Sequence, residues 1–280
     1  ETACKVISPG MRSATKRDID WVFMGLDLHR DRNVTTVHEY CSSSIPPFRN
    51  IKDLVKKNLN ARPDFRLFLN EAVRDRFSFN DHVPYGYRDI GFERTESGLA
   101  GTPEKTTDFI YVGALHNRSH FDALLQHVTT HMPERSLLVI GNIPENLKIK
   151  YKRHPQIRFE GPYPHEKVLS SIRTARYALN WMPDTPPFHV QSSLKFLEYA
   201  ACGVPVITTD YAWIREFERK YGGRCFFVQK DMGNLDWEKI KAFPFSFPDL
   251  EEWAFDRQVT RSGVLEFLRN RFPDGKWLGK

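Results

Sequence analysis

One segment of the chain combines serine, lysine and glutamate residues at a spacing suited to binding an anionic ligand. Ser192, Ser193, Lys195 and Glu198 begin a run with helical periodicity, and Gly203 lies just after its end. A serine can cap a helix, and the free N–H groups of the first turn attract anions such as pyrophosphate. Lys195 adds a positive charge, and Glu198 projects from the same face, where its carboxylate can accept hydrogen bonds from ribose hydroxyls. The spacing favours a ligand with both diphosphate and ribose, although an isolated Lys–Glu pair is more often a surface ion pair.

The elements that must position these residues alternate between strand and helix along the chain. Short apolar or β-branched runs predict strands at residues 5–8, 21–24, 34–38, 65–69, 108–112, 136–140, 157–160, 177–180 and 204–208. Helical spacing of apolar residues predicts helices at residues 51–61, 71–77, 121–130, 166–174 and 193–201, and a helical tail at 250–270. Strands that alternate with helices are typical of an α/β fold with a parallel sheet.

A change of composition between residues 93 and 107 predicts a linker between two domains. This stretch is rich in Gly, Ser, Thr, Pro and charged residues, and it has no apolar periodicity. We therefore expect an N-terminal domain at residues 1–92 and a C-terminal domain at 108–255. A C-terminal helix at 256–280 should pack back toward the N-terminal domain. Since about 92 residues leave room for only four or five strands with their helices, the N-terminal domain should be a reduced one.

The composition is that of a globular protein. Of the 280 residues, 40% are hydrophobic and 27% are charged, so the chain is neither a mini-protein nor generally disordered. No apolar run approaches the length of about 18 residues that a membrane span needs. The four cysteines have no C-x-x-C spacing and are too few for a disulfide framework, which favours a reducing compartment. We therefore expect a cytoplasmic protein.

Basic residues gather in one stretch of the N-terminal half. Arg49, Lys52, Lys56 and Lys57 lie close together, while the net charge of the whole chain is only +6. Such a stretch is more often a solvated face, but it can also meet phosphate groups or an anionic membrane surface. We therefore expect either a solvated surface here or a peripheral contact with the inner face of a membrane.

Residues 198–207 read Glu-Tyr-Ala-Ala-Cys-Gly-Val-Pro-Val-Ile. This segment resembles the pattern E-A-hydrophobic-A-x-G-x-P-V-I, which ends the nucleotide-sugar helix in GT-B glycosyltransferases of the family 4 type. Residues 83–87 (Val-Pro-Tyr-Gly-Tyr), 109–113 and 159–163 (Phe-Glu-Gly-Pro-Tyr) are similar to further landmarks of that family. The resemblance implies a GT-B fold, with two Rossmann-like domains that each contain a parallel sheet. It also implies a glycosyltransferase that uses a nucleotide sugar, with a UDP-sugar as the first choice.

The resemblance also implies a set of residues that bind the donor. Tyr163, Trp181 and Met182 would frame the nucleobase, and buried packing is the equally weighted alternative for each of them. The whole predicted donor site comprises Gly113, Leu115, Arg118, Tyr163, Trp181, Met182, Ser192, Ser193, Lys195 and Glu198.

Departures from the family pattern bear on the stereochemistry of transfer. Val190 stands where retaining family 4 enzymes carry a second glutamate, and Arg118 alone lies near their basic pair. The segment Ser193–Lys195 is more similar to the inverting glucuronosyltransferase of xanthan assembly. This likeness implies an inverting transfer of a hexosyl or glucuronosyl group, in polysaccharide biosynthesis.

An inverting transfer needs a base that takes the proton of the acceptor hydroxyl. Ligands bind at the carboxyl ends of parallel strands, so the end of the strand predicted at 34–38 nominates Glu39 first and His38 second. Asp81 and His82 are a third choice. Lys195 and the start of its helix would stabilise the departing pyrophosphate, which places Lys195 among the catalytic residues.

Two other chemistries have weaker support. Asp18-Ile19-Asp20 spells the D-x-D of metal-dependent glycosyltransferases, but it precedes a predicted strand, whereas the metal-binding motif follows one. We expect no metal and no other cofactor. The G-x-G-x-x-G fingerprint and the P-loop motif are both absent from the sequence.

The acceptor would sit against residues 1–92, and a sugar or lipid-linked sugar is the first expectation. DNA with a hydroxylated base is a less favoured acceptor. The alternative from another class is a module that binds nucleotide sugars without catalysis.

Overall fold

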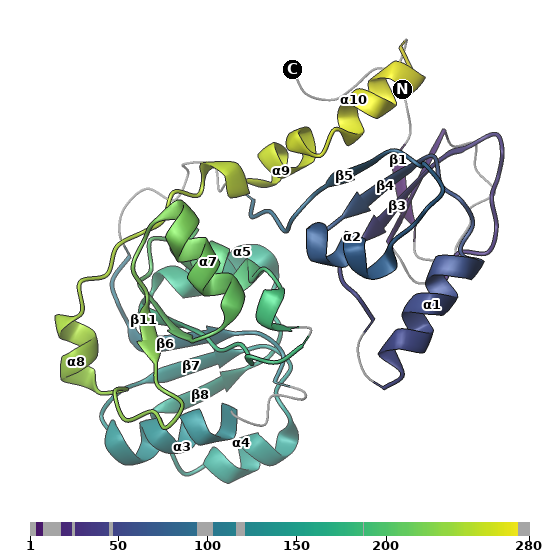
Figure 1. Cartoon of the computed structure of the whole chain (residues 1–280). Coiled ribbons are helices and arrows are strands. Elements are labelled where there is room, and N and C mark those ends of the chain that lie inside the picture. The colour runs from purple at the N-terminus through teal and green to yellow at the C-terminus, as the bar shows by residue number, and fades with distance from the viewer. Residues whose placement is uncertain are drawn as a thin grey trace. The chain divides into compact units, whose positions relative to one another are not determined.

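The computed structural model describes residues 4–7, 18–23, 26–44, 47–93, 103–115, 121–186 and 188–273. The chain divides into two compact units (Figure 1). The first consists of Glu1–Gly91 with Trp253–Lys280, and the second of Phe92–Glu252.

The first unit is built on a five-stranded parallel sheet with the order β1-β2-β3-β4-β5. Its strands are β1 (Cys4–Ile7), β2 (Ile19–Phe23), β3 (Thr35–Tyr40), β4 (Phe65–Phe68) and β5 (Tyr85–Tyr87). Its helices are α1 (Arg49–Leu59), α2 (Glu71–Phe77), α9 (Phe255–Arg261) and α10 (Val264–Arg271). Residues of α10 pack on one face of the sheet, where Val264 and Leu268 meet Ile19, Val37 and Phe65. Side chains of β3, β4 and α2 form a second apolar cluster.

The C-terminal helices approach the sheet closely because one strand residue lacks a side chain. A Cβ atom at Gly86 of β5 would overlap the backbone carbonyl of Ser262, which lies between α9 and α10. Glycine at this position therefore lets the tail pack against β5.

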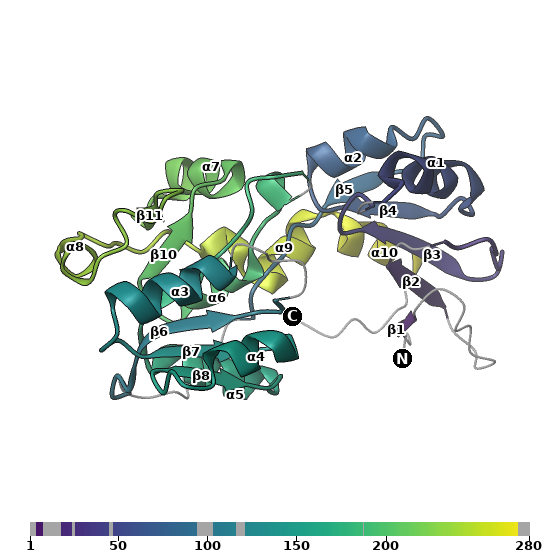
Figure 2. The same ribbon diagram turned by 90° about the horizontal axis from the view of Figure 1, so that it is seen from below.

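The second unit contains a six-stranded parallel sheet with the order β11-β10-β9-β6-β7-β8 (Figure 2). Its strands are β6 (Thr107–Val112), β7 (Leu137–Ile140), β8 (Ile157–Glu160), β9 (Ala175–Asn180), β10 (Val206–Thr209) and β11 (Phe226–Val228). Its helices are α3 (Phe121–His131), α4 (Glu145–Tyr151), α5 (His165–Arg173), α6 (Leu194–Ala201), α7 (Ala212–Tyr221) and α8 (Trp237–Ala242). The core is formed largely by β6, β7 and α3, and it includes Phe109, Leu124 and Val139.

The order of strands in the second unit creates a switch point. From β6 the chain adds β7 and β8 on one side, and it then crosses to place β9 against the other side of β6. In open α/β sheets, ligands bind at such a point, outside the carboxyl ends of the two adjacent strands. A ligand is therefore expected to bind at the loops that follow β6 and β9.

The predicted α/β class with parallel sheets is confirmed in both units. Helix 71–77 and strand 157–160 were predicted with the observed bounds. The predicted end of strand 34–38 was wrong, because Glu39 and Tyr40 continue the pairing with β4. Within the landmark segment 83–87, Tyr85–Tyr87 pairs with β4 as a strand.

Within the described residues, no helix combines the length and apolarity needed to cross a bilayer.

Candidate functional site

The start of α6 is fixed by a serine that both caps the helix and bonds to a neighbouring strand. The Ser193 Oγ accepts a hydrogen bond from the Phe196 backbone N–H at 3.2 Å and donates to Asn180 Oδ1 at 2.8 Å. Because Asn180 is the last residue of β9, the first turn of α6 lies at the carboxyl end of that strand. Of the two serines that could cap this helix, Ser193 does so.

Asn180 also connects the ends of β9 and β10. Its Nδ2 donates to Thr208 Oγ1 at 3.0 Å and to the Tyr211 hydroxyl at 3.1 Å. Just beyond these residues, the Met182 backbone N–H donates to Thr209 Oγ1 at 3.0 Å. These bonds hold the loop after β9 against β10 and thereby give α6 a fixed starting point.

A second hydrogen bond ties α6 to β6 on the other side of the switch point. The backbone N–H of Val112, the last residue of β6, donates to the buried Tyr199 hydroxyl at 2.9 Å. The next residue is Gly113, which packs against Gly141 so closely that a Cβ at Gly141 would overlap the Gly113 carbonyl. The helix and the tight turn after β6 therefore meet at the switch point.

Glu198 is the centre of a small charged cluster on α6. Lys195 Nζ lies 2.6 Å from its Oε2, and His165 Nε2, at the start of α5, lies 3.0 Å from its Oε1. The glutamate side chain is only 4% exposed, whereas those of Lys195 and His165 are 33% and 43% exposed. The buried carboxylate thus holds two partly exposed nitrogen groups at the surface of the site.

Burial and the neighbouring Glu198 raise the pKa of the Cys202 thiol to about 11. The thiol is therefore protonated at neutral pH and is not a nucleophile here.

Two buried polar atoms beside α6 lack a partner among the described residues. They are Ser192 Oγ and His189 Nδ1, and Ser192 is only 5% exposed. An unsatisfied buried hydroxyl costs free energy in the free protein, and a ligand that accepts its hydrogen bond recovers that cost. The start of α6 and the residue before its cap therefore combine an unpartnered buried hydroxyl, a lysine and the free N–H groups of a helix start.

The structure brings most of the predicted donor residues to this end of the second unit. Six of the ten lie on the elements that meet at the switch point, namely Gly113, Met182, Ser192, Ser193, Lys195 and Glu198. Arg118 lies outside the described residues.

Three other predicted donor residues have packing or surface contacts of their own. Leu115 and Trp181 are buried members of the core cluster. The Tyr163 hydroxyl bonds to Glu160, and Lys167 Nζ lies 3.4 Å from the centre of the Tyr163 ring.

Asn180 and His165 bond to Ser193 and Glu198, and neither was predicted from the sequence as a site residue. A polar residue at the end of the predicted strand 177–180, and a histidine just before the predicted helix 166–174, were the available signals. Neither signal indicates which distant side chain the residue will contact.

The candidate bases Glu39 and His38 are both buried in the first unit. Glu39 accepts a hydrogen bond from Trp21 Nε1 at 2.7 Å and forms an ion pair with Arg88. Successive strand residues point to opposite faces of a sheet, so His38 lies on the other face, where its Nε2 is 3.3 Å from Asp27 Oδ2. Both residues thus have partners in loops of the first unit, and His38 is fully buried.

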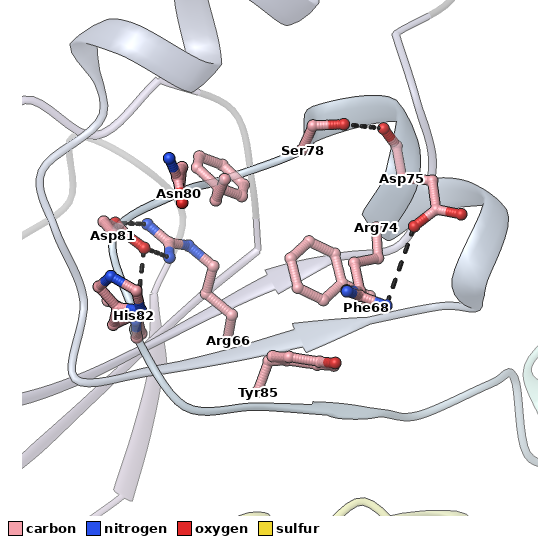
Figure 3. Close-up of a pocket in the computed structure, with 11 residues that line it drawn as sticks. Arg66, Phe68, Arg74, Asp75, Ser78, Asn80, Asp81, His82 and Tyr85 are labelled. Atoms are coloured by element: carbon pink, nitrogen blue, oxygen red, sulfur yellow. Dashed lines mark hydrogen bonds and ion pairs between the residues drawn. The ribbon is translucent and has the colours of Figure 1, made fainter.

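A separate pocket of about 440 Å³ lies beside β4, β5 and the segment that precedes β5 (Figure 3). Arg66 forms two hydrogen bonds to the Asp81 carboxylate, at 2.6 and 2.7 Å, and its guanidinium lies 3.8 Å from the centre of the Phe79 ring. The bonds from Arg66 hold the pKa of Asp81 below its usual range. Asp81, a third-choice base, is therefore a stably ionised partner of Arg66.

The D-x-D segment contributes a buried strand residue. Asp20 lies within β2 and is 1% exposed. Across the described ranges, no group of three or more histidine, cysteine or acidic side chains is arranged to hold a metal ion.

Residues 106–235 match the family model of "Glycosyl transferases group 1". The match extends from the start of β6 past β11 and includes the whole α6 region. A comparison with curated proteins found no significant match.

Solved structures resemble the chain over most of its length. AviGT4, a glycosyltransferase of avilamycin A biosynthesis, has 15% sequence identity and a TM-score of 0.59, covering 94% of this chain and 77% of that one. Sucrose-phosphate synthase from Thermosynechococcus elongatus has 15% identity and a TM-score of 0.59, with 92% and 75% covered. HepE from Anabaena, in complex with UDP and glucose, has 12% identity and a TM-score of 0.57, with 92% and 77% covered.

The chain has the GT-B fold. The segment that matches the group 1 model lies within the second unit, whose switch point carries Ser192, Lys195 and Glu198.

Proposed function

We propose that the protein is a glycosyltransferase that moves a sugar from a nucleotide sugar, with a UDP-sugar as first choice, to an acceptor hydroxyl. The observation that carries the proposal is the start of α6 at the switch point, with an unpartnered buried Ser192 hydroxyl beside Lys195. The group 1 match over residues 106–235 supports the same activity. HepE, a protein of the same fold, binds UDP and glucose.

The diphosphate of the donor would bind at the first turn of α6. Ser193 Oγ is already used in capping the helix, so the available donors are Ser192 Oγ, the free N–H groups of the turn and Lys195. The Glu198 oxygens accept from Lys195 and His165, but each has a further lone pair for a ribose hydroxyl. Donor binding would draw Lys195 from the carboxylate toward phosphate, which leaves Glu198 for the ribose.

We propose an inverting transfer, because Val190 stands where retaining enzymes carry a second glutamate. We also propose that no metal ion is needed, because Asp20 of the D-x-D segment is buried within β2. Lys195 and the start of α6 would stabilise the charge that develops on the departing nucleotide. Glu39 is the candidate base and His38 the second choice. For Glu39 to accept a proton, Arg88 would have to release one carboxylate oxygen, since Arg88 and Trp21 now occupy that group.

A non-catalytic nucleotide-sugar module is the second candidate function. The burial of Glu39 and His38 favours it, because neither side chain now reaches solvent. The two functions predict the same donor affinity and differ only in turnover.

Turnover with a panel of UDP-, GDP- and ADP-sugars, each with and without EDTA, tests the proposal. We expect nucleotide release from UDP-sugars, unaffected by EDTA, with the Glu39→Gln variant slower by about a hundredfold or more at unchanged donor affinity. Loss of turnover in EDTA that Mg²⁺ or Mn²⁺ restores would refute metal independence. Tight donor binding with no turnover on a broad set of acceptors would support the non-catalytic module.

A further inference from the structure

Helix α1 exposes its apolar side and buries its acidic residue, which reverses the usual arrangement of a surface helix. Phe48, just before the helix, and Ile51, Leu54, Val55 and Leu59 have exposed fractions between 36% and 72%. The four aliphatic residues follow the i, i+3, i+4, i+8 spacing that places them on one face. They form a continuous apolar stripe along a helix that lies beside α2 in the first unit (Figures 1 and 2).

The opposite side of α1 is attached to its own unit by polar contacts. Asp53 is the buried residue of the helix, and its carboxylate accepts hydrogen bonds from Arg76 Nε at 2.8 Å and the Ser44 backbone N–H at 2.9 Å. Burial opposes ionisation, but the bonds from Arg76 and Ser44 prevail and lower the pKa of Asp53. The contacts of Asp53 with Arg76 and Ser44 thus determine which side of the helix faces outward.

The charged side chains of α1 are almost all positive. The helix carries Arg49, Lys52, Lys56 and Lys57, and its single acidic residue is the buried Asp53. Long basic side chains beside an apolar stripe can extend toward lipid headgroups while the aliphatic groups enter the acyl region. The same charges oppose pairing with a second copy of the helix, because cations would then face cations.

We propose that α1 is a membrane-docking surface that binds anionic lipid bilayers through the stripe Ile51, Leu54, Val55 and Leu59 and the flanking basic residues. An anionic bilayer supplies an apolar layer for the aliphatic stripe and negative charge for the basic side chains. Docking of this kind would bring the first unit to lipid-linked substrates.

Vesicle co-sedimentation of the full chain tests the proposal. We expect binding to vesicles of equal parts phosphatidylglycerol and phosphatidylcholine, weak binding to phosphatidylcholine alone, and loss of binding at high salt. The Leu54→Ser/Leu59→Ser variant should bind the anionic vesicles at least about tenfold more weakly, since two leucines no longer leave water. The Lys52→Gln/Lys57→Gln variant should lose about tenfold as well.

Two variants on other helices serve as matched controls. Ile149→Ser alters a 67% exposed isoleucine between two lysines on α4, and Lys239→Gln/Lys241→Gln removes two charges from α8. Both should bind vesicles like the wild type. All altered side chains are exposed or at the surface, and unchanged thermal unfolding would confirm that each variant folds.

Three results would overturn the proposal. The first is an absence of vesicle binding, and the second is equal binding by the wild type and the two α1 variants. The third is a concentration-dependent dimer in analytical ultracentrifugation that Leu54→Ser/Leu59→Ser abolishes, without vesicle binding, which would assign the stripe to a second copy of the chain.

Discussion

The Lys195–Glu198 pair differs from other lysine–glutamate or arginine–glutamate pairs with the same spacing in this chain. In the pairs of Lys148, Arg219 and Lys241, the glutamate side chain is at least 58% exposed. Glu198 is 4% exposed and has a second partner, His165. A buried carboxylate that holds basic groups at a helix start is suited to ligand binding, whereas an exposed pair contributes little.

Ser192 should contribute more to ligand affinity than to the stability of the fold. Replacing Ser192 by alanine removes a buried hydroxyl without a partner, so we expect the free energy of unfolding to change by less than about 1 kcal/mol. The affinity for UDP should fall on the order of tenfold, because a hydrogen bond to a charged group is lost. Chemical denaturation and calorimetry measure the two effects.

The neighbouring serine supplies the contrast for that experiment. Ser193→Ala removes a helix cap and the bond to Asn180, and it should cost about 1–2 kcal/mol of stability. If Ser192→Ala proves as destabilising as this variant and leaves UDP affinity unchanged, then Ser192 has a structural role.

The ion pair of Arg66 and Asp81 should make the first unit sensitive to acid. The pKa of Asp81 is lowered in the folded state, so its stabilising contribution is present above the ordinary pKa of an aspartate, about 4. This contribution is lost as the pH falls through the lower folded value. Asp81→Asn should therefore be destabilising at neutral pH. The variant should also lose less stability than the wild type as the pH is lowered, measured by thermal unfolding between neutral and acidic pH. A loss of stability identical to that of the wild type would contradict this role.

At the level of elements, local sequence patterns predicted the positions of helices and strands better than the contacts between them. Helix α6 followed from its cap and apolar spacing, and β8 and α2 had their predicted bounds. The end of β3 was missed, because Glu39 extends the strand through pairing with β4 and bonds to distant Arg88. The outward side of α1 could not be predicted either, since it depends on Asp53 meeting Arg76 far along the sequence.

The attachment of the C-terminal helices to β5 depends on Gly86. Gly86→Ala would force a Cβ against the Ser262 carbonyl, and we expect a loss of about 1–3 kcal/mol from overpacking. Gly161→Ala is the matched control, because a Cβ there meets nothing within 4 Å. Equal denaturation midpoints for the two variants would exclude the close approach of the tail to β5.

At the scale of the whole molecule, the proposed donor site rests on one segment of the sequence, whereas no segment of the first unit carries a comparable signal for an acceptor. Residues 192–207 carry a spacing with a direct chemical meaning, and the group 1 match falls on the same unit. The first unit presents paired and buried polar groups, such as Glu39 with Arg88, whose partners come from separate strands and loops. Such pairings are set by tertiary packing and leave little local signal.

Calorimetric titration of UDP into the full chain, its Lys195→Ala variant and its Lys241→Ala variant tests the α6 donor site most directly. Lys241 pairs with Glu238 at the same three-residue spacing but on the exposed surface of α8, so it controls for the loss of one lysine. We predict that UDP binds the wild type and Lys241→Ala alike, and that it binds Lys195→Ala about tenfold or more weakly. Equal affinities in all three proteins, or no binding of UDP to the wild type, would contradict the assignment.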